Sequence, residues 1–193
     1  MTFSNKKELI VVGGSAGSLS VLMQVIMHVS DEFILPMVIV IHRQRNVLSE
    51  FTKILSQACR HKRIVEPDDK DPIINSSIYV TPQNYHLLIE ADRTFSLDYS
   101  EAIKFSRPSI DVTFESAARV FTNNLTAILL SGANNDGTAG LRMVAEKGGS
   151  VIAQAPESAE FAAMPQSAIE SVAGIHVMNP MQIAEYINSV NSK

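Results

Sequence analysis

Residues 8–22 read ELIVVGGSAGSLSVL. The segment opens with an apolar run at residues 9–12, typical of a short buried strand, and passes into a loop of glycines and serines. Apolar residues then recur at spacings of three and four between Leu19 and Val29, which is the pattern of an amphipathic helix. A strand, a turn of small residues and a helix in this order predict the opening unit of an α/β domain.

Further strand-like runs repeat this alternation later in the chain. They lie at residues 36–41 (PMVIVI), 125–130 (LTAILL) and 150–153 (SVIA), and helical patterns separate them. Apolar strands that alternate with helices predict a parallel sheet covered on both faces.

The helical patterns also indicate where some helices begin and which of their faces is apolar. One of them carries a single apolar face made of Val47, Phe51, Ile54, Leu55 and Ala58. Another restarts near Pro108, which fits a first helical turn with Ser106 or Arg107 near the cap. The last pattern covers about residues 182–190.

The middle of the chain has a different pattern. Short runs at residues 78–81, 86–90 and 94–97 follow a polar, turn-rich segment at 66–77 and predict an antiparallel hairpin or meander at the edge of the sheet. The predicted fold is therefore a three-layer αβα domain with a mainly parallel, doubly wound sheet and an antiparallel edge hairpin. Because no repeat or linker interrupts the chain, residues 1–193 are expected to form one domain.

Composition narrows the class of function. The chain has 193 residues, 46% of them hydrophobic, with a mean hydropathy of +0.10 and a net charge of −4. A globular protein without nucleic acid as its main partner is expected, because no excess of basic residues is available to neutralise phosphates. The sequence shows neither a signal peptide nor an apolar run long enough to span a membrane, so a cytoplasmic location without membrane insertion is expected.

The glycine–serine loop permits three interpretations. Residues 13–17 (GGSAG) match the G-x-S-x-G pattern of a nucleophile elbow, with Ser15 as the nucleophile. They also fit a plain strand-to-helix turn in which the serine only caps the helix. A dinucleotide-binding loop fits poorly, since its pattern requires glycine where Ser15 and Ser18 stand.

A base and an acid for Ser15 are available at two other strand ends. Of the five histidines, His42 is the one that closes the run at residues 36–41, and Asp136 follows the run at 125–130. Each has an ordinary structural interpretation, since His42 can lie on the surface and Asp136 can form a turn or cap the next helix. Ligand sites of open α/β sheets lie outside the carboxyl ends of the strands, so the three residues together predict a Ser–His–Asp triad. In that triad His42 takes the proton of Ser15, Asp136 orients the imidazole, and backbone N–H groups near Ala16 or in the SGANN loop bind the oxyanion.

A series of motifs resembles a known family. The motifs are GGSAGS, VIVIH, IYVTPQNYHL, RPSIDVTFESAA, LLSGANNDGTAG and FAAMPQSAI, and in order and spacing they resemble the catalytic domain of the chemotaxis protein-glutamate methylesterase CheB. The resemblance assigns the triad to Ser15, His42 and Asp136. It implies hydrolysis of glutamate γ-methyl esters on the cytoplasmic helices of chemoreceptors with release of methanol, deamidation of receptor glutamines in many members, and no metal or organic cofactor.

The chain departs from the family pattern at several positions. Ala133 and Asn134 stand where methionine and glycine are usual, and Ala16 stands where a hydroxyl residue is common. By resemblance, the backbone N–H of residue 133 contributes to the oxyanion hole, and Arg107 and Met164 lie at the rim of the substrate cleft.

The departures and the start of the first strand affect the expected regulation and function. That strand begins near residue 8, so the sequence predicts a single-domain form without the usual receiver domain and a separate receiver protein as a candidate regulator. Two alternatives stay open: a catalytically degenerate signalling or interaction domain of the same fold, and a phosphate or nucleotide binder.

Overall fold

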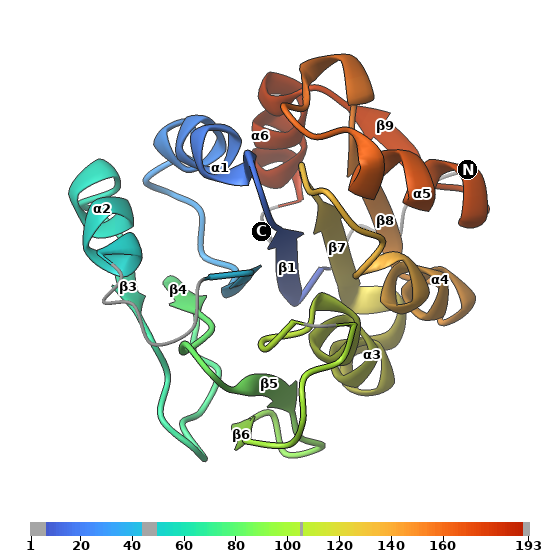
Figure 1. Cartoon of the computed structure of the whole chain (residues 1–193). Coiled ribbons are helices and arrows are strands. Elements are labelled where there is room, and N and C mark those ends of the chain that lie inside the picture. The colour runs from blue at the N-terminus through green and yellow to red at the C-terminus, as the bar shows by residue number, and fades with distance from the viewer. Residues whose placement is uncertain (1–6, 44–49, 105, 191–193) are drawn as a thin grey trace.

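The computed structural model describes residues 7–43, 50–104 and 106–190. Within these residues, seven strands form one sheet in the order β3-β4-β2-β1-β7-β8-β9, and every neighbouring pair is parallel (Figure 1). The strands are Leu9–Gly14 (β1), Met37–Ile41 (β2), Arg63–Val65 (β3), Ser77–Val80 (β4), Leu125–Leu129 (β7), Ser150–Gln154 (β8) and His176–Met178 (β9). The chain places β2, β3 and β4 on one side of β1 and then β7, β8 and β9 on the other, which confirms the predicted doubly wound sheet.

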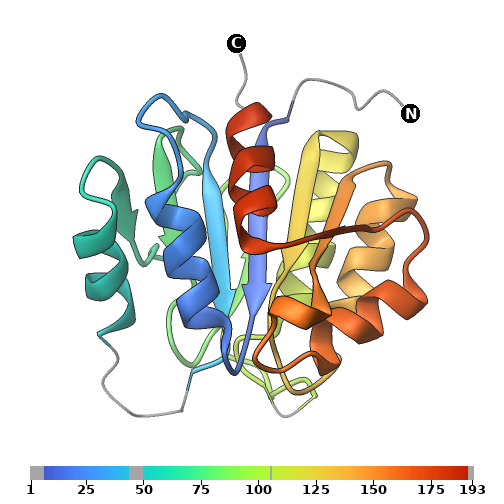
Figure 2. The same ribbon diagram turned by 90° about the horizontal axis from the view of Figure 1, so that it is seen from above.

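Helices cover both faces of this sheet, as predicted. They are Ser18–Met27 (α1), Phe51–Ala58 (α2), Ile110–Phe121 (α3), Thr138–Glu146 (α4), Ala163–Ser171 (α5) and Pro180–Ser189 (α6). Figure 2 shows α1 and α6 in front of the strands. Val47, expected on the second helix, lies outside the described residues.

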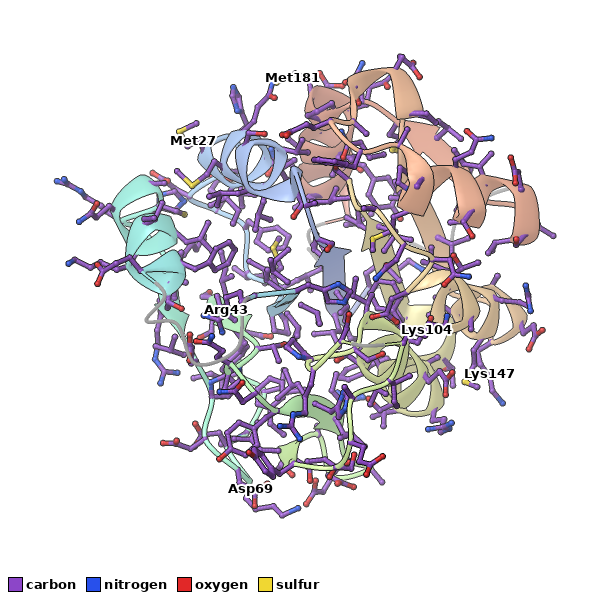
Figure 3. The ribbon with its side chains drawn as sticks, in the orientation of Figure 1. Met27, Arg43, Asp69, Lys104, Lys147 and Met181 are labelled. Atoms are coloured by element: carbon purple, nitrogen blue, oxygen red, sulfur yellow. The ribbon has the colours of Figure 1, made fainter. Side chains whose placement is uncertain are left out.

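Strand β1 illustrates how the sequence produces the two layers. Successive side chains of a strand point to opposite faces. Ile10 and Val12 pack with apolar side chains of α1, α2 and α6, whereas Leu9 and Val11 pack with those of α3, α4 and α5. On the outer surface of the first layer, Met27 of α1 and Met181 of α6 remain exposed (Figure 3).

The middle of the chain differs in part from the expectation. Residues His86–Ile89 (β5) and Phe95–Asp98 (β6) form an antiparallel hairpin, but it is a separate two-stranded sheet. The run at residues 78–81 does not join it, because β4 pairs in parallel with β2 and β3 inside the main sheet. The hairpin packs against α3 instead, where Ser116 and Thr113 bond to its backbone.

The start of one helix and the presence of two short elements also differ from the sequence pattern. Helix α3 begins at Ile110 rather than around Pro108, because the backbone of Ser109 is still extended. Strand β3 and helix α5 had no counterpart in the predicted elements: β3 has only three residues, and α5 has Pro165 in its first turn. Within the described residues, no helix is both long and apolar enough to cross a membrane.

Close packing between β1 and α3 makes a prediction at Gly13. A Cβ atom at this position would lie 2.4 Å from Cγ2 of Ile110. Gly13→Ala is therefore expected to lower the free energy of unfolding in urea by up to about 3 kcal/mol. Gly174→Ala is the control, since Gly174 has a φ of 74° but no atom within 4 Å of the point that a Cβ would occupy, so only a backbone cost of about 1 kcal/mol applies. Equal stability of the two variants would contradict the packing.

Candidate active site

Ser15, His42 and Asp136 lie at the carboxyl ends of three adjacent strands at the centre of the sheet. Ser15 and His42 directly follow β1 and β2, and Asp136 ends the loop that follows β7. The chain changes its direction of strand addition between β2 and β7, and this is the position where ligand sites of doubly wound sheets form.

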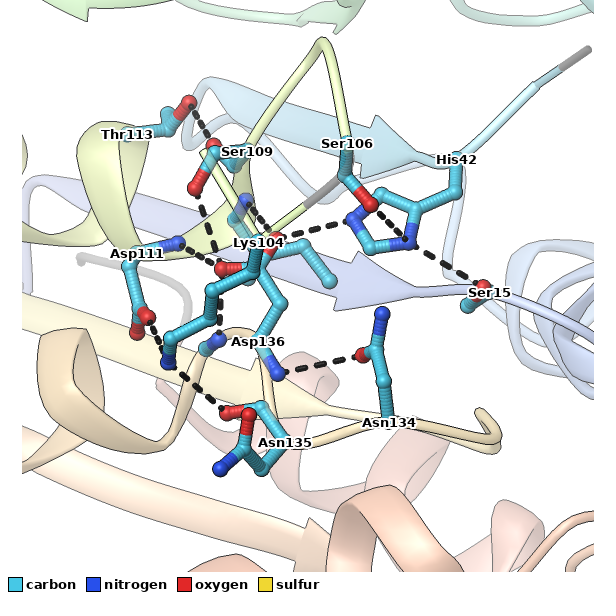
Figure 4. Close-up of polar contacts among 12 residues, drawn as sticks. Ser15, His42, Lys104, Ser106, Ser109, Asp111, Thr113, Asn134, Asn135 and Asp136 are labelled. Atoms are coloured by element: carbon cyan, nitrogen blue, oxygen red, sulfur yellow. Dashed lines mark hydrogen bonds and ion pairs between the residues drawn. The ribbon is translucent and has the colours of Figure 1, made fainter. Parts of the chain in front are cut away.

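The three side chains form one hydrogen-bond chain (Figure 4). Oγ of Ser15 is 3.1 Å from Nδ1 of His42, and Nε2 of His42 is 2.8 Å from Oδ2 of Asp136. An ionised carboxylate only accepts hydrogen bonds, so Nε2 carries the proton of the neutral imidazole and Nδ1 is left as an acceptor. The hydroxyl of Ser15 therefore donates to the nitrogen that would take its proton.

The loop around Ser15 is fixed by the loop that follows β7. The N–H of Ser15 donates to the carbonyl oxygen of Ser131 at 2.9 Å, and the hydroxyl of Ser131 donates to the carbonyl of Ala16. Gly17 completes the turn into α1 with a φ of 73°. A Cβ atom there would lie 2.8 Å from Oγ of Ser131, so the turn requires glycine for its conformation and for space.

Asp136 is fully buried at the amino end of α3. Its carboxylate accepts the N–H groups of Ile110 and Asp111 and the hydroxyl of Ser109, at 2.7, 3.1 and 3.0 Å. Burial by itself would raise the pKa of Asp136, but the hydrogen bonds from His42, Ile110 and Asp111 outweigh burial and lower the pKa to about 2. The alternative that Asp136 only caps the helix after it is incomplete, because its carboxylate also accepts hydrogen bonds from the N–H groups in the first turn of α3.

A second buried carboxylate lies beside the first. Asp111 accepts Nζ of Lys104 at 2.7 Å and the N–H of Gly140 at 2.8 Å. Burial raises the pKa of Asp111 and the charge of Asp136 acts in the same direction, while Lys104 and Gly140 offset this in part. Lys104 thus supplies the positive charge for the carboxylate that His42 does not contact.

Sequence reasoning missed two contacts of this site. Oγ of Ser106 lies 3.3 Å from Nδ1 of His42, so a second hydroxyl approaches the same nitrogen as Ser15. His86 is fully buried: its Nδ1 accepts the N–H of Ser109 at 3.1 Å and its Nε2 donates to the carbonyl of Glu101 at 3.0 Å. His86 belongs to a motif noted in the sequence and Ser106 was a candidate helix cap, but no periodicity indicates which partner each one reaches.

The other residues predicted to line the oxyanion hole or the substrate cleft differ in their exposure. Ala16 and Ala133 are exposed in the loops beside Ser15 and Asp136. The guanidinium of Arg107 stacks 4.0 Å from the ring centroid of Tyr99 and donates to backbone carbonyls of the same segment. Met164 was expected at the rim of the cleft but does not lie there, because its side chain is fully buried against Gly132.

Within the described part of the chain, no group of three or more His, Cys, Asp or Glu residues could hold a metal ion.

The lowered pKa of Asp136 predicts a pH effect on stability. The carboxylate titrates at about 2 in the folded protein against 3.8 when unperturbed, so its contribution is complete above pH 3.8 and is lost as the pH falls towards 2. This contribution is about 2 kcal/mol. Urea unfolding at pH 5 and pH 2.5 is expected to show a smaller loss of stability for Asp136→Asn than for the wild type.

Asp68→Asn, at an exposed position, is the control and is expected to follow the wild type. The same loss of stability in wild type and Asp136→Asn would contradict the assigned hydrogen bonds.

Comparisons with known proteins point to one group. A family model described as CheB methylesterase matches residues 10–187. A relative from Leptospira interrogans, provisionally named protein-glutamate methylesterase/protein-glutamine glutaminase, is 43% identical over 178 residues that cover 92% of each chain. The protein-glutamate methylesterase/protein-glutamine glutaminase of Thermotoga maritima is 30% identical and matches 92% of this chain but 52% of its own length. The crystal structure of the Thermotoga maritima CheB methylesterase catalytic domain aligns with a TM-score of 0.89 at 27% identity, covering 96% of this chain and 99% of that one.

Proposed function

The chain belongs to the CheB methylesterase family, and from this premise we propose that it hydrolyses glutamate γ-methyl esters on the cytoplasmic helices of chemoreceptors, with Ser15 as nucleophile. The observation that carries the proposal is the unbroken hydrogen-bond chain from Ser15 through His42 to Asp136. The names of the relatives support the ester as substrate.

In the first step Ser15 is acylated. Its Oγ attacks the ester carbonyl carbon while Nδ1 of His42 takes the hydroxyl proton. The tetrahedral intermediate collapses, the bond to the methoxy oxygen breaks, and the proton on Nδ1 leaves with it as methanol. Asp136 holds the imidazole through Nε2 and stabilises its positive charge in between.

In the second step water releases the product. Nδ1 of His42 takes a proton from water as the water oxygen attacks the acyl carbon, and the same proton returns to Oγ of Ser15 when the acyl bond breaks. Glutamate and free enzyme result. Because Asp136 stays ionised well below neutral pH, it can fulfil its role throughout the range in which histidine acts as a base.

The oxyanion of both steps requires donors close to Ser15. The N–H of Ala16, directly after the nucleophile, has no acceptor among the described residues and suits this role. The N–H of Ala133 is equally open, so replacing the usual methionine by alanine leaves the backbone donor in place. Donors of this kind contribute about 3 kcal/mol each to the transition state.

The proposed partners follow from the same resemblance. The proposed substrate is a methylated receptor helix, and the proposed regulator is a separate receiver protein. The chain would act on the receptor in the cytoplasm, as a single catalytic domain.

Methanol release from a methylated receptor fragment tests the function. Ser15→Ala is expected to lower kcat at least about a thousandfold, because the proposed acyl-enzyme forms on Oγ of Ser15. Ser20→Ala is the matched control, since this exposed serine lies on α1 and, among the described residues, its hydroxyl donates only to the carbonyl of Gly17. Equal rates above the enzyme-free background would refute Ser15 as the nucleophile, and rates equal to that background in both proteins would leave a binding domain of the same fold.

Deamidation is the second reaction that the relatives' names support. The same steps on a glutamine side chain expel ammonia in place of methanol. Ammonia release from a glutamine-bearing receptor fragment is expected with wild type and to be lost in Ser15→Ala. Release that persists in Ser15→Ala would assign it to a different site.

A further inference from the structure

The loop at residues 130–137 joins the two ends of the hydrogen-bond chain. At its start, the carbonyl of Ser131 accepts the N–H of Ser15 at 2.9 Å. At its end, Asp136 accepts Nε2 of His42 at 2.8 Å. The middle of this loop therefore lies between the contact with Ser15 and the contact with His42.

Most backbone donors of the loop are already used. The N–H groups of Ser131, Gly132 and Asp136 donate to Oε1 of Gln154, the carbonyl of Phe161 and Oδ1 of Asn134, respectively. Among the hydrogen bonds of the described residues, open donors remain at positions 133, 134 and 135.

The side chain of Asn134 is held in one orientation. Its Oδ1 accepts the N–H of Asp136 at 3.1 Å, and because an N–H can donate only to the oxygen of an amide, Nδ2 must point the other way. Figure 4 shows this nitrogen turned towards the side on which His42 and Ser15 lie. Within the described residues Nδ2 has no acceptor, and the side chain is only partly exposed.

We propose that Asn134 is a catalytic residue whose Nδ2–H donates to the oxyanion of the tetrahedral intermediate. When Oγ of Ser15 bonds to the carbonyl carbon, the π electron pair of the carbonyl moves onto its oxygen, and the Asn134 amide stabilises the resulting charge. When the intermediate collapses, that pair re-forms the carbonyl and methoxide leaves with the proton from His42. Side-chain amides that are fixed before the reaction are effective donors to such oxyanions.

This assignment goes beyond the family pattern, in which glycine is usual at position 134 and cannot supply a side-chain donor. It deepens the proposed function and rests on Ser15 as nucleophile. The donor acts mainly on the transition state, so its loss is expected to appear in kcat rather than in KM.

Two substitutions separate a catalytic role from a structural one. Asn134→Gly removes both the donor and the acceptor for Asp136, and is expected to lower kcat about 100-fold. Asn134→Asp keeps an oxygen for the N–H of Asp136 but replaces Nδ2 by a carboxylate oxygen that repels the oxyanion, so kcat is expected to fall further, about 1000-fold. A purely structural role predicts the opposite order, with Asn134→Asp close to wild type.

The experiment measures kcat and KM for methanol release from a methylated receptor fragment, using the full chain. Wild type, Asn134→Gly, Asn134→Asp and Ser15→Ala are compared, and thermal unfolding midpoints report whether each variant is folded. Asn75→Asp is the matched control, because it adds the same charge at an exposed position just before β4, at the opposite end of the sheet from Ser15, and is expected to retain activity.

A fall in kcat at both Asn134 variants, larger for aspartate, with KM nearly unchanged, supports the proposal. Serine-dependent activity that survives in Asn134→Asp, or a fall confined to KM, overturns it while the proposed function stands. Wild-type activity equal to that of Ser15→Ala overturns the proposed function and this assignment with it.

Discussion

The buried carboxylate of Asp136 is the constraint on which the site depends. A fully buried charge is stable only when it is paired and hydrogen-bonded, and this one has four protein donors besides His42: the N–H groups of Ile110, Asp111 and Gly137 and the hydroxyl of Ser109. These contacts join the loop after β7 to the amino end of α3. The same carboxylate fixes the tautomer and the direction of the His42 ring.

The parallel sheet brings the residues of the site together at one edge. Strands β2, β1 and β7 are neighbours, so their carboxyl ends bring a histidine, a serine and the loop with Asp136 to one edge. The bond from Ser15 to Ser131 then sets the distance between the nucleophile and that loop. The proposed acyl transfer therefore uses groups that follow the three central strands, and the first turn of α3 together with Ser109 holds Asp136 in place.

Residues whose position follows from local secondary structure could be predicted from the sequence, whereas residues placed by contacts distant in sequence could not. Ser15, His42 and Asp136 could be selected because apolar periodicity locates strand ends, and strand ends of a parallel sheet meet. The start of α3 could not be placed, because the extended backbone of Ser109 accompanies contacts with Asp136 and His86 that lie far away in sequence. The position of β4 was ambiguous because a four-residue apolar run fits a hairpin as well as a buried parallel strand.

The orientation of the Asn134 side chain could not be predicted from the sequence either, although its contact is local. Its contact with Asp136 spans only two residues, yet sequence alone does not indicate that Nδ2 is turned towards the side on which His42 and Ser15 lie. Met164 was misplaced for a related reason, since its motif gives no information about the space beneath Gly132. Chemistry could be predicted where it coincides with the ends of secondary structure, and not where it depends on the direction of one side chain.

Ser106 is the informative competitor of the proposed nucleophile Ser15, because both hydroxyl groups approach the same nitrogen of His42. Labelling the full chain with a fluorophosphonate and mapping the adduct by peptide mass spectrometry distinguishes the two serines. One adduct per chain is expected, on Ser15, and it disappears in His42→Ala. An adduct on Ser106, or no adduct under conditions that label a known serine esterase, would contradict Ser15 as the nucleophile.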